Sequence, residues 1–446
     1  MLSPGQHSGD SASVACYYPG VGKMVVPARL RRSTREIASL ALFCAIAGAC
    51  HAQEGAVVCR DGTGNFEAAF PSGVSAQAGA ARREGLARRA CEGSLLWDRG
   101  KLVVATGVAQ VDVDAFGIDL GLGPPVVTFQ VKRTNAECCM TLQIYSLRRP
   151  PKLLRTITGG SFFSTTDTDL DGQIEIWTND AASLEGFESA EASRPDFAPT
   201  VVLRFDQGRL LDVSSEFQGY FDNEIARARS ALDPGDLRDF KNSSGRLPPT
   251  AHFSPEDLRQ SDKLERTKAR VLQIIRSYLY SGREQEAWDS LAELWPPEDL
   301  DRIRAAILGA RARGIRAQVD SLSTKVSSGA ERRTEVVDAR TLRAVQPGIK
   351  FAGERVEEKR SEIILPAPIW IGRQVPEGQP EDTLADSEML LDLVIDSAGK
   401  VRSAESDNPS FDSSLKSATA RWKFVPTLRA GRAIASRIYF IISPKR

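Results

Sequence analysis

The spacing of apolar positions changes its period along the chain. Short runs that alternate apolar and polar residues, separated by turn residues, fill residues 55–217. From Gly219 to about residue 322, apolar positions instead recur every three or four residues. A period of two is typical of strands, and a period near 3.6 is typical of helices. The chain is therefore predicted to be multidomain α+β, with a mainly antiparallel β domain followed by a helical region.

Six runs in residues 55–217 carry the strand pattern most clearly. They span residues 101–106, 126–131, 140–146, 153–158, 173–177 and 200–205. The last run is followed by Asp206-Gln207-Gly208 and a return strand over 210–213. These turn residues are typical of a β-hairpin. Short strands at such spacing indicate an antiparallel sandwich or an incomplete propeller-like stack of sheets, and the pattern leaves both open.

The region 219–322 is predicted to contain short helices over 224–232 and 298–314, with a longer helix that begins at Ser254-Pro255. Gly282 is expected to break that helix into a hairpin with the next one. The hairpin resembles one tetratricopeptide unit, but a lone unit has no stacked neighbours to bury its face. A plain αα-hairpin docked on the β domain is therefore favoured.

Residues 323–362 mix charged residues with Gly and Ser and show little sustained period. They are predicted to form a flexible linker with a mean reach of about 30 to 40 Å. Beyond it, alternation over 389–395 predicts a strand, the turn Asp396–Gly399 returns the chain over 400–405, and 436–442 predict a last strand. Between them, apolar spacing over 411–422 predicts a helix that Pro426 ends.

The same segment carries a family resemblance. It contains V-I-D-x-x-G-x-V from Val394 to Val401, then A-x-x-x-W-x-F-x-P from Ala418 to Pro426, then Gly431 before a terminal strand. In that order, these signatures resemble the C-terminal domain of TonB-family proteins, which places such a domain at about 389–442, within residues 363–446. The resemblance implies a small antiparallel sheet with one packed helix, located in the periplasm.

The TonB-like resemblance also implies a way of binding. Such domains pair a strand with an extended peptide of an outer-membrane or other envelope protein, in some cases during transmembrane transport. Core packing is favoured for Trp422 because of its helical spacing. The implied partner-binding residues are the last strand and two aromatic residues that would flank its pockets, namely Ser436, Arg437, Ile438, Tyr439, Phe440, Ile441, Ile442, Trp422 and Phe424.

The amino-terminal stretch is typical of an export signal. An arginine cluster over 29–35 precedes the apolar run 37–49, which is shorter than the roughly 20 residues of a membrane span. Residues 1–52 are interpreted as an over-extended start, with Met24 as the initiator, followed by a signal peptide cleaved after Ala52. Lipid attachment at Cys50 and an uncleaved membrane anchor are the less favoured alternatives.

Export gives the cysteines a meaning. The mature chain would keep four, of which Cys59 and Cys91 are the favoured disulfide pair in an oxidising compartment. Cys138 and Cys139 are adjacent, and a strained bond between them and a buried thiol pair are left equally open. Neither zinc-binding nor C-x-x-C spacing is present.

A second motif follows the predicted β domain's fourth strand. Asp167, Asp169 and Asp171 alternate before Gly172, and Glu175 lies within the next predicted strand. Alternate carboxylates on a tight loop suit a hard cation, and the spacing resembles the calcium loops of FG-GAP repeats. The competing interpretation is an acidic surface turn whose aspartates accept from local backbone amides. A bound Ca²⁺ is expected to be structural, because no residues suited to activating water stand beside it.

Composition narrows the classes of function. The chain has 58 basic and 58 acidic residues, so its balance argues against a nucleic-acid binder. A nucleophile elbow, a phosphate loop and a dinucleotide fingerprint are all absent from the sequence, so no enzyme and no small-molecule substrate are predicted. The leading hypothesis is an exported envelope protein that binds partners by strand pairing. The alternative is a secreted, calcium-stabilised scaffold or interaction protein outside energy transduction.

Overall fold

The structure is a computed structural model. It describes residues 58–81, 90–135, 138–184, 187, 197–245, 255–323, 337–345, 363–364, 367–370, 389–406, 419–420, 422–429 and 432–442. Residues 50–446 form one compact unit by their contacts. The predicted leader over 1–52 and the predicted helix over 411–422, apart from its last residues, lie outside the described part. Sheets and helices both occur, so the α+β class is confirmed.

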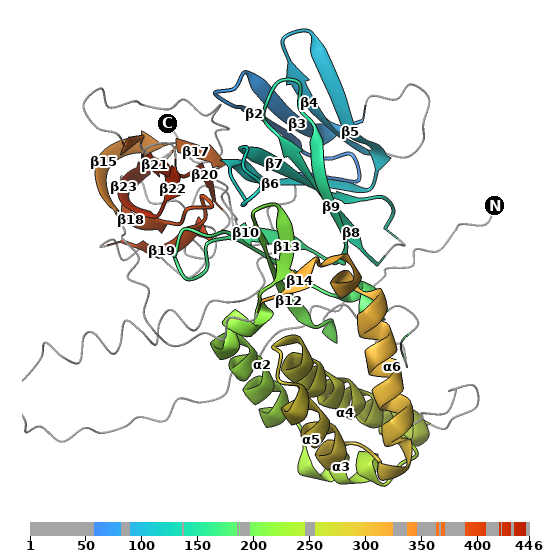
Figure 1. Ribbon diagram of the computed structural model, residues 1–446. Helices are drawn as coiled ribbons and strands as arrows, with labels where there is room; N and C mark the ends of the chain where they lie inside the picture. Colours follow the sequence, from blue (N-terminus) through green and yellow to red (C-terminus); the bar gives the residue numbers. More distant parts are fainter. Residues whose placement is uncertain are drawn as a thin grey trace, which may run out of the picture. The chain divides into compact units, whose positions relative to one another are not determined.

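Three sheets make up the β domain (Figure 1). The first contains β2 (Asn65–Ala69), β3 (Val74–Ala80), β4 (Cys91–Trp97) and β5 (Gly100–Val108), paired in that order. The second has the order β1 (Cys59–Arg60), β6 (Gln110–Ile118), β7 (Val126–Lys132), β8 (Met140–Ser146) and β9 (Leu153–Gly160). The third has the order β10 (Phe163–Thr166), β11 (Glu175–Asn179), β12 (Thr200–Asp206), β13 (Arg209–Asp212) and β14 (Ser321–Leu322).

The first and second sheets pack on each other as a sandwich. Phe66 of β2 and Phe116 of β6 place their ring centroids 5.7 Å apart. A Cβ on Gly93 of β4 would lie 3.2 Å from the side chain of Val111 and 3.3 Å from that of Phe129, so the two sheets interdigitate closely there. Of the two predicted arrangements, the structure therefore has the sandwich for this pair of sheets, with a third sheet beside it.

Strand β6 is buried along nearly its whole length. Val111 and Val113 belong to the core shared with the first sheet. Because successive side chains of a strand alternate in direction, Asp112 and Asp114 face the other way. Both aspartates are nonetheless buried, and this places two carboxyl groups inside the protein.

The helical region contains the predicted helices and one more among the described residues. Its α-helices are α2 (Gln218–Ser230), α3 (Pro234–Lys241), α4 (Pro255–Tyr280), α5 (Glu284–Leu294) and α6 (Leu300–Arg313). The additional helix is α3, where the sequence predicts only a helix end at Pro234-Gly235, and α2 begins before the predicted position 224. Gly282, with a φ of +84°, separates α4 from α5 as the sequence predicts. None of the helices in the described residues is long and apolar enough to cross a membrane.

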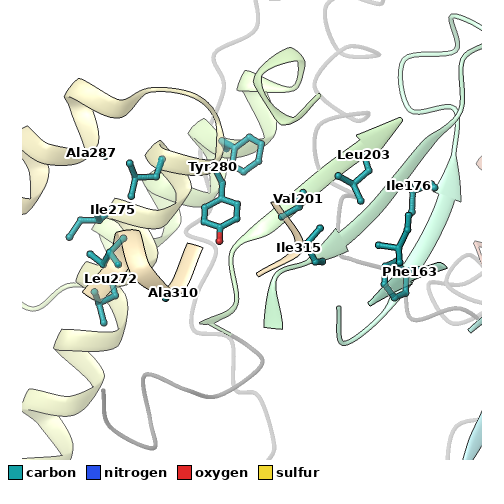
Figure 2. Close-up of a cluster of buried hydrophobic side chains, with 14 of the residues drawn as sticks. Phe163, Ile176, Val201, Leu203, Leu272, Ile275, Tyr280, Ala287, Ala310 and Ile315 are labelled. Carbon is teal, nitrogen blue, oxygen red and sulfur yellow. The ribbon is translucent and has the colours of Figure 1, made fainter. Parts of the chain in front are cut away.

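One hydrophobic core joins the helices to the third sheet. Figure 2 shows Leu272 and Ile275 of α4 on the helical side of this core and Val201 of β12 on the sheet side. Between them, the Tyr280 hydroxyl donates a 2.7 Å hydrogen bond to Asp180, which also accepts from the backbone of Ile315. Residues of the helices and of the third sheet thus belong to one hydrophobic core.

The terminal module, defined here as the described residues from 363 to 442, contains three small sheets with the elements β16 (Ile363–Ile364), β17 (Ala367–Trp370), β18 (Met389–Ile395), β19 (Val401–Glu405), β20 (Lys423–Val425), β21 (Thr427–Arg429), β22 (Arg432–Ile434) and β23 (Ser436–Ile442). β18 and β19 form the predicted hairpin, and β23 pairs antiparallel with β18.

One strand of this sheet comes from outside the module. β15 (Val337–Val345) lies within residues 323–362 and pairs in parallel with β23. The sheet order is therefore β15-β23-β18-β19. The expectation of a flexible linker over all of 323–362 is corrected for this stretch. Its physical reason is that β23 offers a free row of backbone groups, which an extended segment satisfies without any strong periodicity of its own.

The structure confirms the preferred disulfide. Cys59 and Cys91 are joined, with their Cα atoms 5.9 Å apart, and both are fully buried. Cys138 and Cys139 form a second disulfide between neighbours, with Cys138 exposed, so they are not a buried thiol pair.

Candidate metal site and peptide-binding edge

The acidic motif forms the loop between β10 and β11. β10 ends at Thr166 and β11 begins at Glu175, so the first and last acids of the motif stand where the two paired strands open. Leu170 and Gly172 adopt positive φ values of 60° and 83°, which bend the intervening backbone back on itself. Glycine takes this conformation at little cost, as the sequence predicts for position 172.

The structure brings three of the four predicted ligands together. Asp167, Asp169 and Glu175 each offer an oxygen atom, and these atoms lie within 4.8 Å of one another. Asp171 is not part of this cluster. Its two carboxylate oxygens accept from the backbone and side-chain amides of Gln173, at 2.8 and 2.6 Å. In this respect the loop follows the alternative interpretation, in which aspartates accept from local amides. Asp169 also accepts from the backbone amide of Asp171 at 3.2 Å, and Asp167 accepts from that of Gly172 at 3.0 Å.

Two of the clustered acids are fully buried. Oδ1 of Asp167 and Oε1 of Glu175 have no hydrogen-bond partner among the described residues. The other oxygen of Glu175 accepts from the backbone of Thr168 at 2.9 Å, and Arg204 approaches Oε1 at 3.7 Å. Burying a carboxylate oxygen without a hydrogen-bond donor costs free energy. The loop therefore has two oxygens that a further ligand or donor could stabilise.

The electrostatics of the loop reflect this burial. Burial, together with the neighbouring negative charge of Asp396, raises the pKa of Asp167 to about 7. Burial also raises the pKa of Glu175 well above its ordinary value, with Asp169 and Asp167 adding like-charge repulsion. Both shifts have the same main cause, which is burial of the carboxyl group, and neighbouring negative charges add to it.

The turn between β18 and β19 lies against this loop. The Ser397 hydroxyl donates a 2.6 Å hydrogen bond to Oδ2 of Asp167. In the other direction, the hydroxyl of Thr166 and the backbone amide of Asp167 donate to Oδ2 of Asp396, at 2.9 and 3.2 Å. Both Asp396 and Ser397 are fully buried. The sequence predicts the turn and the acidic loop separately, but nothing in either pattern indicates that they meet.

A second group of charges fastens the terminal module to β6. Lys400 and Lys423 both pair with Asp114, and Lys423 also donates to the backbone carbonyl of Val113. Burial, with repulsion from Lys400, lowers the pKa of Lys423 to about 8. Burial raises the pKa of Asp112 to about 6 even though Lys423 opposes that shift. Sequence reasoning missed this cluster, although two aspartates within a strongly apolar strand are a signal for buried partners.

The predicted partner-binding strand is internal to its sheet. β18 pairs along one side of β23 and β15 pairs along the other, so the edge expected to be open is covered. Ser436 and Ile438 are buried, Tyr439 is half-buried, and the exposed Arg437 pairs with Asp392 of β18. The backbones of Phe440, Ile441 and Ile442 join both pairings, while their side chains lie outside the described part of the structure.

The two aromatic residues expected near the peptide pockets are inside the protein. Trp422 is 2% exposed and Phe424 is fully buried. Trp422 thus has the core position that its spacing favours, and neither ring lines an open surface pocket.

Comparisons with protein-family models, with curated proteins and with solved structures give no match for this chain.

Proposed function

We propose that this protein is an exported cell-envelope protein whose terminal module binds an extended segment of an envelope partner by strand pairing along β23. The observation that carries the proposal is the parallel pairing of β15 with β23, from Val337 opposite Ser436 to Val345 opposite Ile442. An extended segment that does not belong to the TonB-like motif is bound there through backbone hydrogen bonds. Such bonds make few demands on side chains, so a peptide of another protein could form them equally well.

In this proposal β15 is an internal occupant of the binding edge. A partner strand takes its place, with main-chain bonds to β23 supplying affinity and side chains on alternate positions supplying selectivity. The partner must compete with β15 for this edge, and the protein with a free β23 edge is a minor state. The apparent affinity for the partner is therefore lower than its affinity for the free edge. The proposed activity is binding, and it requires no catalytic residue or small-molecule substrate.

A photocrosslinking experiment tests this proposal. A benzophenone amino acid replaces Tyr439, which pairs with Leu342 of β15, in the full chain expressed in its own cell envelope. We expect a crosslink to an extended segment of one envelope protein. A double variant, Leu342→Pro with Arg343→Pro, should increase this crosslink. Consecutive backbone amides of a strand point to opposite sides, so one of the two prolines removes a hydrogen bond from β15 to β23 and weakens their pairing.

The matched control is Leu342→Ala with Arg343→Ala, which keeps both amides and should crosslink as the unmodified chain does. A second control places the benzophenone at Ser403 on β19, which does not neighbour β23 in the sheet, so it should not label the segment bound along β23. If the probe at Tyr439 labels no partner even in the proline variant, strand binding along β23 is disproved.

Export is part of the proposal and has its own support and test. The Cys59–Cys91 disulfide is the kind of bond that persists in oxidising compartments and is rare in the cytosol. Amino-terminal sequencing of the protein from fractionated cells should give Gln53 as the first residue. A first residue upstream of the apolar run would instead support an uncleaved anchor, and a lipid-modified Cys50 would support a lipoprotein.

One observation favours the second candidate function, a secreted, calcium-stabilised scaffold or interaction protein outside energy transduction. Lys423, Asp396 and Ser397 of the terminal module are buried against the β domain, so these contacts fix the module in place. A scaffold role predicts that the proline variant changes neither the partners nor the localisation of the protein. The crosslinking comparison therefore distinguishes the two functions.

A further inference from the structure

Where the acidic loop contacts the turn Asp396–Gly399 of the terminal module, buried carboxylate oxygens lack hydrogen-bond donors. Asp167, Asp169 and Glu175 converge, and Asp167 and Glu175 are fully buried, each with one oxygen that accepts no hydrogen bond from the described residues. Arg204 lies 3.7 Å from the Glu175 oxygen. A buried acceptor without a donor is uncommon in folded proteins and calls for a specific occupant. Local amides account for Oδ2 of Asp167 and Oδ1 of Asp169, but not for Oδ1 of Asp167 or Oε1 of Glu175.

The donor set selects the class of occupant. The convergent groups are carboxylates, so the ligand atoms are hard oxygens, which suit Ca²⁺ and Mg²⁺ better than the softer transition metals. The loop opens at the exposed Asp169, so water can complete a coordination shell there. Ca²⁺ accepts irregular shells of six to eight oxygens, whereas Mg²⁺ demands a near-ideal octahedron. Two buried carboxylates and one exposed carboxylate, completed by water, therefore favour Ca²⁺.

The terminal module orients one of the three ligands. Asp167 has its Oδ2 held by the hydroxyl of Ser397, which leaves Oδ1 for the cluster. The backbone amide of the same residue donates to Asp396, whose Oδ1 in turn accepts from the amides of Ala398 and Lys400. Residues that support metal ligands in this manner typically change metal affinity by 10- to 100-fold when they are removed.

We propose that Asp167, Asp169 and Glu175 bind a calcium-type divalent cation, and that the bound cation holds the turn Asp396–Gly399 against the loop. The cation supplies the positive charge that the buried carboxylates share. It thereby relieves the repulsion between Asp167 and Asp396, which stand on opposite sides of the contact between the loop and the turn. Cation binding and docking of the turn strengthen each other, because each favours the same arrangement of Asp167. This inference does not depend on peptide binding along β23.

Terbium luminescence tests the site in the full-length mature chain. Tb³⁺ replaces Ca²⁺ at oxygen sites, and the indole of Trp177 donates a 2.7 Å hydrogen bond to Thr168 within this loop, so it is placed to sensitise the ion. We expect saturable emission that Ca²⁺ displaces. Trp177→Phe should remove most of the emission, while calorimetry with Ca²⁺ still detects binding.

Two matched variants identify the ligands. Asp169→Asn removes an exposed carboxylate, so folding is not at risk, and should weaken Ca²⁺ binding at least about tenfold. Asp171→Asn removes a carboxylate that already accepts from Gln173 and should change affinity less than about twofold. Equal losses in the two variants, or the absence of saturable binding, would overturn the site and leave a general acidic surface.

Coupling to the terminal module has a separate measurement. Ser397→Ala should weaken Ca²⁺ binding about tenfold, although it removes no ligand. Hydrogen exchange at the amides of Ala398 and Lys400 should slow when Ca²⁺ is added to the unmodified chain and respond less in Asp169→Asn. Unchanged affinity in Ser397→Ala together with unchanged exchange would disprove the coupling. Circular dichroism without added cation confirms that each variant is folded.

Discussion

The hydroxyl of Ser397 donates a 2.6 Å hydrogen bond to the carboxylate of Asp167, a residue 230 positions earlier in the chain. Both residues are fully buried. This bond joins the turn of the β18–β19 hairpin to the loop between β10 and β11. It is therefore a contact on which the docking of the terminal module and the shape of the acidic loop both depend.

Removing that hydroxyl should destabilise the protein. A buried hydrogen bond to a charged or partly charged group contributes roughly 1.5 to 3 kcal/mol, so Ser397→Ala should lower the free energy of unfolding by about that amount. Chemical denaturation in the presence of a chelator measures the difference without any cation effect. The matched control is Ser403→Ala on the exposed side of β19, which should cost less than about 0.5 kcal/mol. Equal losses in the two variants would contradict the importance of this contact.

The buried lysines should depend on Asp114. Asp114→Asn leaves Lys400 and Lys423 without the carboxylate that both contact, and breaking a buried pair in this manner typically costs 3 to 5 kcal/mol. Asp98→Asn is the comparison, because Asp98 pairs with Arg149 on the surface and should cost less than about 1 kcal/mol. Urea titrations of both variants give the two free energies. A small loss for Asp114→Asn would mean that water reaches these lysines.

The contribution of Asp112 to stability should fall as the pH rises from about 4 to about 6. Burial raises the pKa of Asp112 from 3.8 to about 6, so the folded chain keeps a proton that the unfolded chain has released. The stabilisation from this group is complete below pH 3.8 and is lost as the pH rises through 6, and a shift of this size corresponds to about 3 kcal/mol. Lys423 opposes the shift and Asp114 adds to it.

Other groups titrate over the same range, so the test is a difference. The free energy of unfolding of the unmodified chain should decline relative to that of Asp112→Asn between pH 4 and pH 6. Denaturation at half-unit steps of pH gives both profiles, and parallel profiles would refute a raised pKa for Asp112.

Reducing the Cys59–Cys91 disulfide should also lower stability. The bond closes a loop between residues 32 positions apart, for which constraint of the unfolded chain predicts roughly 3 to 4 kcal/mol. Cys59→Ser with Cys91→Ser should therefore lower the melting temperature by several degrees. Dithiothreitol should lower that of the unmodified chain but have little further effect on the variant. A similar effect of reductant on both proteins would assign the stabilisation to Cys138 and Cys139 instead.

The sequence was most informative where side chains follow a local period. The hairpin from Leu203 to Asp212 and the helix break at Gly282 are encoded by neighbouring residues, because turn chemistry and backbone freedom act over a few positions. β15 shows the opposite case. Its residues show no sustained alternation, and its strand conformation depends on the free backbone groups of β23 about a hundred positions later.

The acidic loop divides in the same way. Alternating aspartates and Gly172 indicate a tight acidic turn from spacing alone. Which carboxylates converge depends on hydrogen bonds, since Gln173 binds Asp171 while Asp167, Asp169 and Glu175 remain together. The contributions of Ser397 and Asp396 come from a distant segment, so no local pattern could have revealed them.

By itself, the sequence determined the α+β class, the positions of ten of the 23 strands and four of the five α-helices in the described residues, the Cys59–Cys91 pair and the acidic loop, because each follows from local periodicity, turn residues or a small set of cysteines. The tertiary structure decided that β23 is an internal strand, that Lys423 meets Asp114, and that Ser397 meets Asp167. These outcomes depend on which distant backbone edges and buried charges satisfy one another when the chain packs, and that choice is made by the whole fold and not by any segment of it.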